Sequence, residues 1–136
     1  SGVAAWDLTL EIMDYVEKIY LVEADADWIE ALKYTFKPYL DKVIFIKAFL
    51  GNGNSNSITI DEIIGDEKVD FIKMDIEGAE RDALDGAKKV LQKQNPNIAV
   101  CTYHNVDDYS QIKKKLIKLG YAIEPTNGYM VFLNSN

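Results

Sequence analysis

Short apolar runs alternate with amphipathic segments along this sequence, and this alternation limits the fold more than any other feature. Buried strands are expected at 19–22, 43–46, 71–74 and 98–101, which are short, mostly apolar and rich in β-branched or aromatic residues. Helical spacing of apolar residues occurs between these runs. The pattern therefore predicts an α/β chain of three layers: an open, mostly parallel sheet with helices on both faces.

The helices are expected at 8–16, 27–40, 80–94 and 108–119. Asp27 and Glu30 have the spacing of a capping box at the start of the second helix. Tyr15, Trp28 and Tyr34 fall on helix faces that we expect to point into the core. Two last strands, at 121–124 and 129–133, flank a Pro-Thr-Asn-Gly turn and predict a C-terminal antiparallel hairpin.

Length, charge and cysteine content exclude several classes of protein. The 136 residues suit a single domain spanning 1–136. A net charge of -7 argues against a nucleic-acid or membrane-surface binder, because both need clustered basic residues. Cys101 is the one cysteine, so an internal disulfide is excluded and a reducing, cytoplasmic location is expected. No apolar stretch is long enough to span a membrane, and no secretory signal begins the chain.

A group of carboxylates follows the strand expected at 71–74. Asp75 and Glu77 come directly after the strand, and Gly78 permits a tight turn into the next helix. Ligands of open α/β sheets bind beyond the carboxyl ends of the strands. If the strand extends that far, Asp75 and Glu77 lie on the same side of it. This strand end is therefore the first candidate for a functional site.

Two neighbouring residues leave alternatives open. Asp75 needs a partner if it is buried, and Lys73 is one candidate for that partner. Glu80 lies in the first turn of the expected helix, where a negative charge is favoured by the helix dipole. Stabilisation of the helix and a role in the site are equally compatible with this position of Glu80.

His104 is the sole histidine, and it follows the strand expected at 98–101. A lone histidine can be a general base, a metal ligand or a structural residue. A cation site built from Asp75, Glu77 and His104 is conceivable, since divalent ions accept such ligands. The sequence contains no metal-ligand spacing motif, however, and we expect no metal.

Glu23 ends the strand expected at 19–22. An acidic residue at the end of the second strand of a nucleotide-binding sheet can accept both ribose hydroxyls of a cofactor. The alternative is that Glu23 or Asp25 only caps the following helix. Spacing alone does not decide between the two.

The stretch 72–80, Ile-Lys-Met-Asp-Ile-Glu-Gly-Ala-Glu, resembles the signature of the FkbM family of S-adenosylmethionine (SAM)-dependent methyltransferases. The likeness continues in Ala83-Leu84 and Gly86-Ala87 and is weaker over the rest of the chain. It implies a Rossmann-like fold and SAM as cofactor. It also implies O-methylation of a hydroxyl group on a small metabolite, sugar or polyketide.

The resemblance assigns roles to individual residues. It implies that His104 is the first candidate for the general base, that Asp75 is the second, and that Glu77 belongs to the same catalytic group. It also implies cofactor-binding roles for the four residues Gly2, Asp7, Glu23 and Asp75, with Glu23 on the ribose. Gly2 and Asp7 stand in the remnant of the family's glycine-rich loop.

Two departures from the family pattern bear on activity. Trp6 stands where the family has its second glycine, so an indole would fill part of the methionine pocket. The strand that precedes this loop in the family, and lies between 19–22 and 71–74 in its sheet, is not in the sequence. Three explanations stay open: residues beyond this sequence supply the strand, the flanking strands pair directly, or a partner chain donates it. An open internal edge also favours a homodimer.

A second hypothesis of another class follows from these departures. The chain would then be a methyltransferase-like binding or interaction module without catalytic activity. A nicotinamide-dependent dehydrogenase is disfavoured, because the sequence contains no G-x-G-x-x-G.

Overall fold

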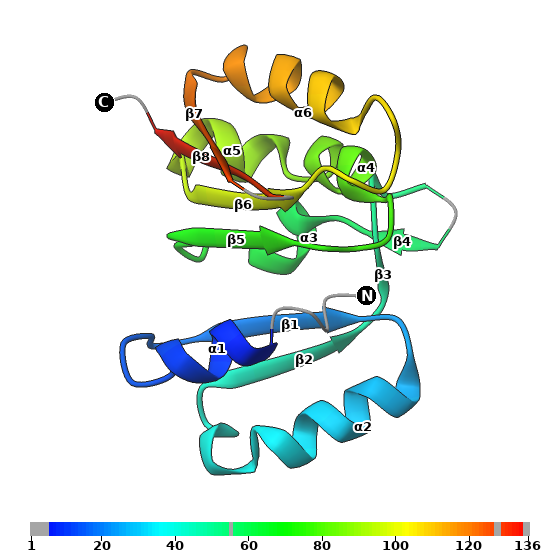
Figure 1. Ribbon diagram of the computed structural model, residues 1–136. Coiled ribbons are helices and arrows are strands. Elements are labelled where there is room, and N and C mark those ends of the chain that lie inside the picture. Colours follow the sequence, from blue (N-terminus) through cyan, green and yellow to red (C-terminus); the bar gives the residue numbers. More distant parts are fainter. Residues whose placement is uncertain (1–5, 55, 127–128, 135–136) are drawn as a thin grey trace. The chain divides into compact units, whose positions relative to one another are not determined.

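The computed structural model describes residues 6–54, 56–126 and 129–134 (Figure 1). The chain divides into two compact units, residues 1–49 and 50–136. Within the described ranges, none of the helices combines the length and apolarity that crossing a bilayer requires.

The first unit is a parallel strand pair with helices. Its elements are α1 (Trp6–Ile12), β1 (Ile19–Glu23), α2 (Ala26–Thr35), the 3-10 helix η2 (Lys37–Tyr39) and β2 (Val43–Lys47). β1 runs parallel to β2, from Ile19 opposite Val43 to Glu23 opposite Lys47. A small apolar core holds the unit together through Met13, Leu32, Phe36 and Val43. Strands 19–22 and 43–46 were thus predicted to within one residue.

The second helix differs from its prediction at both ends. Asp25, rather than Asp27, caps α2, and its side chain accepts hydrogen bonds from the backbone N–H groups of Asp27 and Trp28. The expected capping box of Asp27 and Glu30 is therefore wrong. The helix ends at Thr35 because Pro38, in the first turn of η2, lacks the N–H that an α-helix needs.

Three aromatic residues were wrongly predicted to lie in the core. Tyr15, Trp28 and Tyr34 are 88%, 48% and 81% exposed. The buried face of α2 instead carries Ile29 and Leu32. The 27–40 pattern contained two overlapping apolar stripes, and the structure buries the one through Ile29 rather than the one through Trp28.

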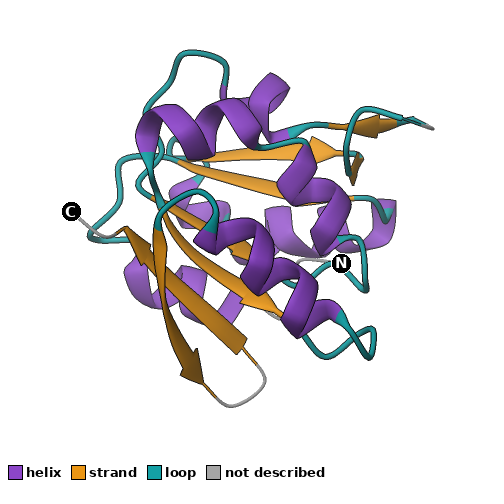
Figure 2. Cartoon of the chain, turned by 90° about the horizontal axis from the view of Figure 1, so that it is seen from above, coloured by secondary structure: helices purple, strands orange, loops and turns teal. Residues whose placement is uncertain are grey.

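The second unit contains a four-stranded mixed sheet. Its elements are the short pair β3 (Phe49–Leu50, which starts at the end of the first unit) and β4 (Ser57–Ile58), then α3 (Ile60–Ile64), β5 (Phe71–Met74), α4 (Glu80–Asp85), α5 (Lys88–Gln94), β6 (Asn97–Cys101), α6 (Asp108–Ile117), β7 (Tyr121–Thr126) and β8 (Tyr129–Asn134). The strand order is β5-β6-β8-β7. β5 and β6 are parallel, and β8 is antiparallel to both β6 and β7. The predicted hairpin is confirmed (Figure 2).

β6 is an interior strand of this sheet, with β5 on one side and β8 on the other. Ile98, Val100 and Cys101 in this strand are fully buried, as the uninterrupted apolar run predicted. Leu84 and Leu116, from α4 and α6, belong to the same set of fully buried side chains.

Among the described residues, β1 pairs with β2 alone and β5 pairs with β6 alone. Each therefore has one edge without a strand in the part of the chain that the structure describes. The single domain, the strand expected to precede the first helix and a homodimer through an open edge all stay predictions.

The helix expected at 80–94 is broken into α4 and α5 at Gly86 and Ala87. Gly86 lies against the segment that joins β3 to α3. A Cβ built on Gly86 would lie 2.1 Å from the carbonyl oxygen of Gly51 and 3.0 Å from the Cβ of Thr59. Because a backbone carbonyl cannot move aside as a side chain can, only glycine allows this close approach.

We predict that Gly86→Ala lowers the free energy of unfolding by about 3 kcal/mol or more, since a methyl group there must displace backbone. Gly65→Ala is the matched control: Gly65 has φ 57 but no atom within 4 Å of its would-be Cβ. The control should cost roughly 1–2 kcal/mol of backbone strain. Urea denaturation followed by circular dichroism measures both, and equal losses would contradict the steric argument.

Candidate functional site

The carboxyl ends of β5 and β6 bring three of the predicted site residues together. Asp75 directly follows Met74, the last residue of β5, and His104 follows β6 after a short connection. Parallel strands end at the same edge of a sheet, so the residues that follow them become neighbours. Glu77 reaches the same point from the turn after β5.

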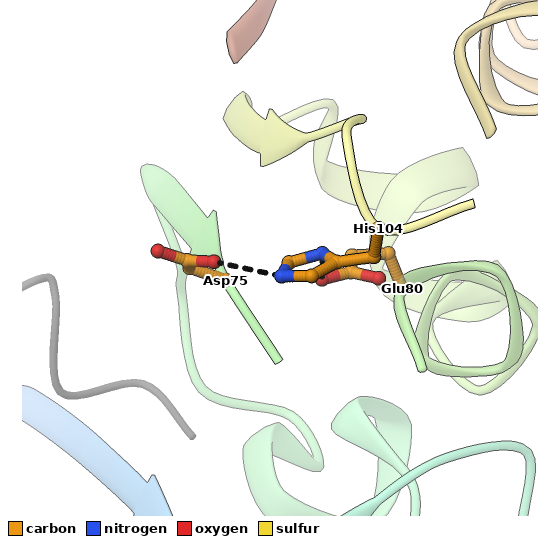
Figure 3. A group of neighbouring side chains, drawn as sticks. All are labelled: Asp75, Glu80 and His104. Atoms are coloured by element: carbon orange, nitrogen blue, oxygen red, sulfur yellow. Dashed lines mark ion pairs between the residues drawn. The ribbon is translucent and has the colours of Figure 1, made fainter. Parts of the chain in front are cut away.

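His104 lies among carboxylates. Its Nε2 is 3.6 Å from Asp75 Oδ1 and 3.6 Å from Glu77 Oε2, and its Nδ1 is 3.1 Å from Glu80 Oε1. Figure 3 shows the imidazole between the Asp75 and Glu80 side chains. The exposed fraction of the side chain is 11% for His104, 4% for Asp75 and 72% for Glu77. The group thus has a buried part and one carboxylate in contact with solvent.

Strand alternation does not explain how Glu77 reaches the site. β5 ends at Met74, before either Asp75 or Glu77. Glu77 has φ 57, a left-handed conformation that non-glycine residues rarely adopt, and Gly78 follows with φ 96. This turn directs the Glu77 side chain toward His104. Strained residues of this kind gather at functional sites.

Glu80, whose role the sequence left undecided, lies in the same group of side chains. It begins α4 and is 0% exposed. Its Oε1 accepts a hydrogen bond of 2.9 Å from the backbone N–H of Ile76, and its Oε2 is buried without a hydrogen-bond partner. The sequence shows that Glu80 lies four residues after Ile76, which is close enough for this hydrogen bond. It does not show that Glu80 is buried, because a carboxylate in the first turn of a helix ordinarily faces water.

Tyr103 is the hydrogen-bond donor to Asp75. Its hydroxyl donates to Asp75 Oδ1 at 3.0 Å, so the expected shortage of partners is met by this phenol and by His104 rather than by Lys73. Loss of water around the phenol, and then the bond to Asp75, raise the pKa of Tyr103. The phenol therefore stays protonated and remains a donor throughout the ordinary pH range.

The connection that carries His104 is held by a buried ion pair. Asp108 is 0% exposed and accepts hydrogen bonds from the backbone N–H and the side-chain amide of Asn105, at 2.7 and 3.0 Å. Arg81 donates its Nε–H to Asp108 at 2.7 Å and also pairs with Asp107. Arg81 follows Glu80 in α4, so one network fixes both sides of the site.

We predict that Asp108→Asn lowers the free energy of unfolding by about 3 kcal/mol, because it leaves Arg81 poorly paired and turns an amide toward the donors of Asn105. Asp107→Asn is the matched control on the same guanidinium and should cost much less, since Asp107 is 56% exposed. Urea denaturation of both variants measures the difference. Similar losses would show that burial does not set the strength of these contacts.

Acid pH is expected to remove the contribution of Asp107. The hydrogen bond from Arg81 lowers the pKa of Asp107 below its ordinary value of 3.8. A lowered pKa stabilises the fold above the ordinary value, and this stabilisation is lost as the pH falls through the lowered pKa. Below about pH 4 the wild type should therefore lose stability more steeply than Asp107→Asn, as acid titration followed by circular dichroism would measure.

Glu23 lies in the other unit, at the end of β1. It is 4% exposed, its Oε1 accepts from the backbone N–H of Asp25 at 2.9 Å, and its Oε2 is buried without a partner. Asp25 caps α2, so capping is not the role of Glu23. Asp7 is the second residue of α1 and its side chain is not described, whereas Gly2 lies outside the described residues.

Comparison with known proteins identifies the family. Residues 54–123, just over half of the 136, match the model of the FkbM methyltransferase domain. The chain belongs to the FkbM methyltransferase family. The match contains Asp75, Glu77, Glu80 and His104, but not Glu23.

A solved FkbM methyltransferase from Methylobacillus flagellatus KT has the same fold. It superposes with a TM-score of 0.82 at 23% sequence identity and covers 96% of this chain. The alignment spans 40% of the length of that protein. The predicted Rossmann-like α/β fold class is thereby confirmed. A search of curated proteins found no match.

Proposed function

We propose that this chain is the SAM-dependent methyltransferase domain of an FkbM protein and that it methylates a hydroxyl oxygen of a small molecule such as a sugar or polyketide. The observation that supports the proposal most is the meeting of Asp75, Glu77 and His104 at the ends of β5 and β6, within the family match. Bound SAM would supply an electrophilic methyl group on its sulfonium.

Glu23 fits the cofactor's ribose. A ribose offers hydroxyl donors, and the buried Oε2 of Glu23 is an acceptor that lacks one. An acceptor without a partner is costly at such a depth, so a ribose hydroxyl there would satisfy it. We assign Asp75 a second contact with the cofactor, and Asp7 and Gly2 to the loop that approaches it.

His104 takes up the proton that the hydroxyl group loses when it accepts the methyl group. A neutral imidazole accepts a proton at Nε2, the nitrogen that faces Asp75 and Glu77. Asp75 Oδ1 and Glu77 Oε2, each 3.6 Å from Nε2, flank the nitrogen that takes the proton. Glu77 is the one of the two that can pass the proton on to solvent, since it is 72% exposed.

Cofactor binding gives a direct test. We expect calorimetry to show micromolar binding of SAM and of its demethylated product to this chain. Glu23→Gln should weaken both about 10–100-fold, the loss expected for charge-assisted hydrogen bonds to a ribose. Asp25→Asn is the control, because asparagine caps a helix as well as aspartate does and leaves Glu23 in place.

The result also decides between the enzyme and the alternative of an inactive binding module. A folded chain that binds neither compound would favour the inactive binding module and would rule out the assignment of Glu23 to the cofactor ribose. Equal weakening by Glu23→Gln and Asp25→Asn would mean that the helix terminus, rather than the Glu23 carboxylate, matters for binding.

We predict that His104→Gln reduces methyl transfer by about 10²–10⁴-fold while the affinity for SAM stays within about twofold. Transfer of labelled methyl groups to a panel of hydroxylated sugars and polyketides measures the first quantity, and calorimetry the second. Full activity in His104→Gln would remove His104 as the proton acceptor.

A further inference from the structure

We propose that Asp75, Glu80 and His104 form a binding site for a divalent transition-metal cation. Each residue offers one ligand atom such that all three atoms lie within 4.8 Å of one another. Ligands held at about 2.1 Å from one cation lie roughly 3–4 Å apart, so modest side-chain movement suffices to close the site. The three side chains come from the end of β5, the start of α4 and the connection after β6 (Figure 3).

Two buried atoms without hydrogen-bond partners point to a missing ligand. Oε2 of Glu80 is one, in a side chain that is 0% exposed, and Nδ1 of His104 is the other. The Nδ1 is 3.1 Å from Glu80 Oε1, but the direction is unsuitable for a hydrogen bond. A buried carboxylate oxygen needs a donor or a cation. A cation bound by Glu80 would satisfy its Oε2.

Hydrogen bonds from other residues also orient the carboxylates of Asp75 and Glu80. Asp75 accepts from the Tyr103 hydroxyl, and Glu80 accepts from the backbone N–H of Ile76. Each bond engages one oxygen of its carboxylate. Outer contacts of this kind fix metal ligands in place and are a regular part of metal sites.

The ligand chemistry selects the type of ion. One imidazole nitrogen with two carboxylates suits first-row transition ions such as Mn²⁺ or Zn²⁺. Mg²⁺ and Ca²⁺ prefer an all-oxygen set and should bind more weakly. Glu77, exposed and 3.6 Å from His104 Nε2, can provide a further contact from the solvent side.

Binding of the cation is independent of methyl transfer, and only its link to the reaction rests on the proposed function. A bound ion would make His104 a ligand and would itself hold the acceptor oxygen. His104 takes the proton in the chain without the ion, and in the ion-bound chain that role would pass to Glu77, the exposed carboxylate of the group.

The test is a titration of the whole 136-residue chain with Mn²⁺, in the absence of SAM. Electron paramagnetic resonance measures free Mn²⁺, and calorimetry with Zn²⁺ and Mg²⁺ gives the order of affinities. We expect one Mn²⁺ per chain, and at least tenfold weaker binding in Asp75→Asn, Glu80→Gln and His104→Gln. Glu80→Gln keeps the oxygen that accepts from Ile76, so the fold should survive, as circular dichroism would verify.

Asp70→Asn is the matched control, because Asp70 is exposed and lies just before the opposite end of β5. Its affinity for Mn²⁺ should equal that of the wild type. No saturable binding of Mn²⁺ or Zn²⁺ by the folded chain would overturn the proposal. Binding that persists in both Asp75→Asn and Glu80→Gln would do so too. Because SAM is absent, neither result depends on whether the chain is a methyltransferase.

Discussion

The parallel pairing of β5 with β6 is the interaction on which the site depends. Phe71 to Met74 lie opposite Asn97 to Val100, so the two strands end at the same edge of the sheet. This pairing brings Asp75 and His104 together, because the two residues are 29 positions apart in the sequence and no local structure joins them. β6 is fixed in turn by burial between β5 and β8, with three of its side chains fully inside the core.

Burial of negative charge is the unusual feature of the second unit. Asp75, Glu80 and Asp108 are all 4% exposed or less, in a chain whose net charge is -7. Asp108 has a full complement of partners in Arg81 and Asn105. Glu80 has an oxygen with none. Because buried carboxylates are costly without compensation, we propose the cation site at Glu80 and not at Asp108.

Sequence periodicity predicted the strands well and the helix ends poorly. β5 was predicted at its observed bounds, because a short apolar run between polar residues indicates a buried strand and also marks where it starts and ends. The start of α2 depended on a choice among Asp25, Asp27 and their hydrogen bonds, which spacing does not settle. The choice of the buried face was a separate error, which placed Trp28 in the core although it is half exposed and Ile29 is buried.

Only part of the candidate site could be predicted from the sequence. Asp75 and His104 could be predicted because both follow strands, and the sequence indicates where a strand ends. Glu80 was left undecided, since its burial results from the packing of α4 against the β6–α6 connection. The left-handed conformation of Glu77 was likewise beyond what residue type indicates.

We propose that the carboxyl ends of β5 and β6 form the functional site of this FkbM chain. His104 is the only histidine, so a chain with ¹⁵N-labelled histidine gives one pair of imidazole nitrogen signals. The most direct measurement is the nuclear magnetic resonance spectrum of this ring during titration with SAM. We expect both nitrogen signals to shift in a saturable manner. If they stay unchanged while SAM binds, the functional site lies elsewhere.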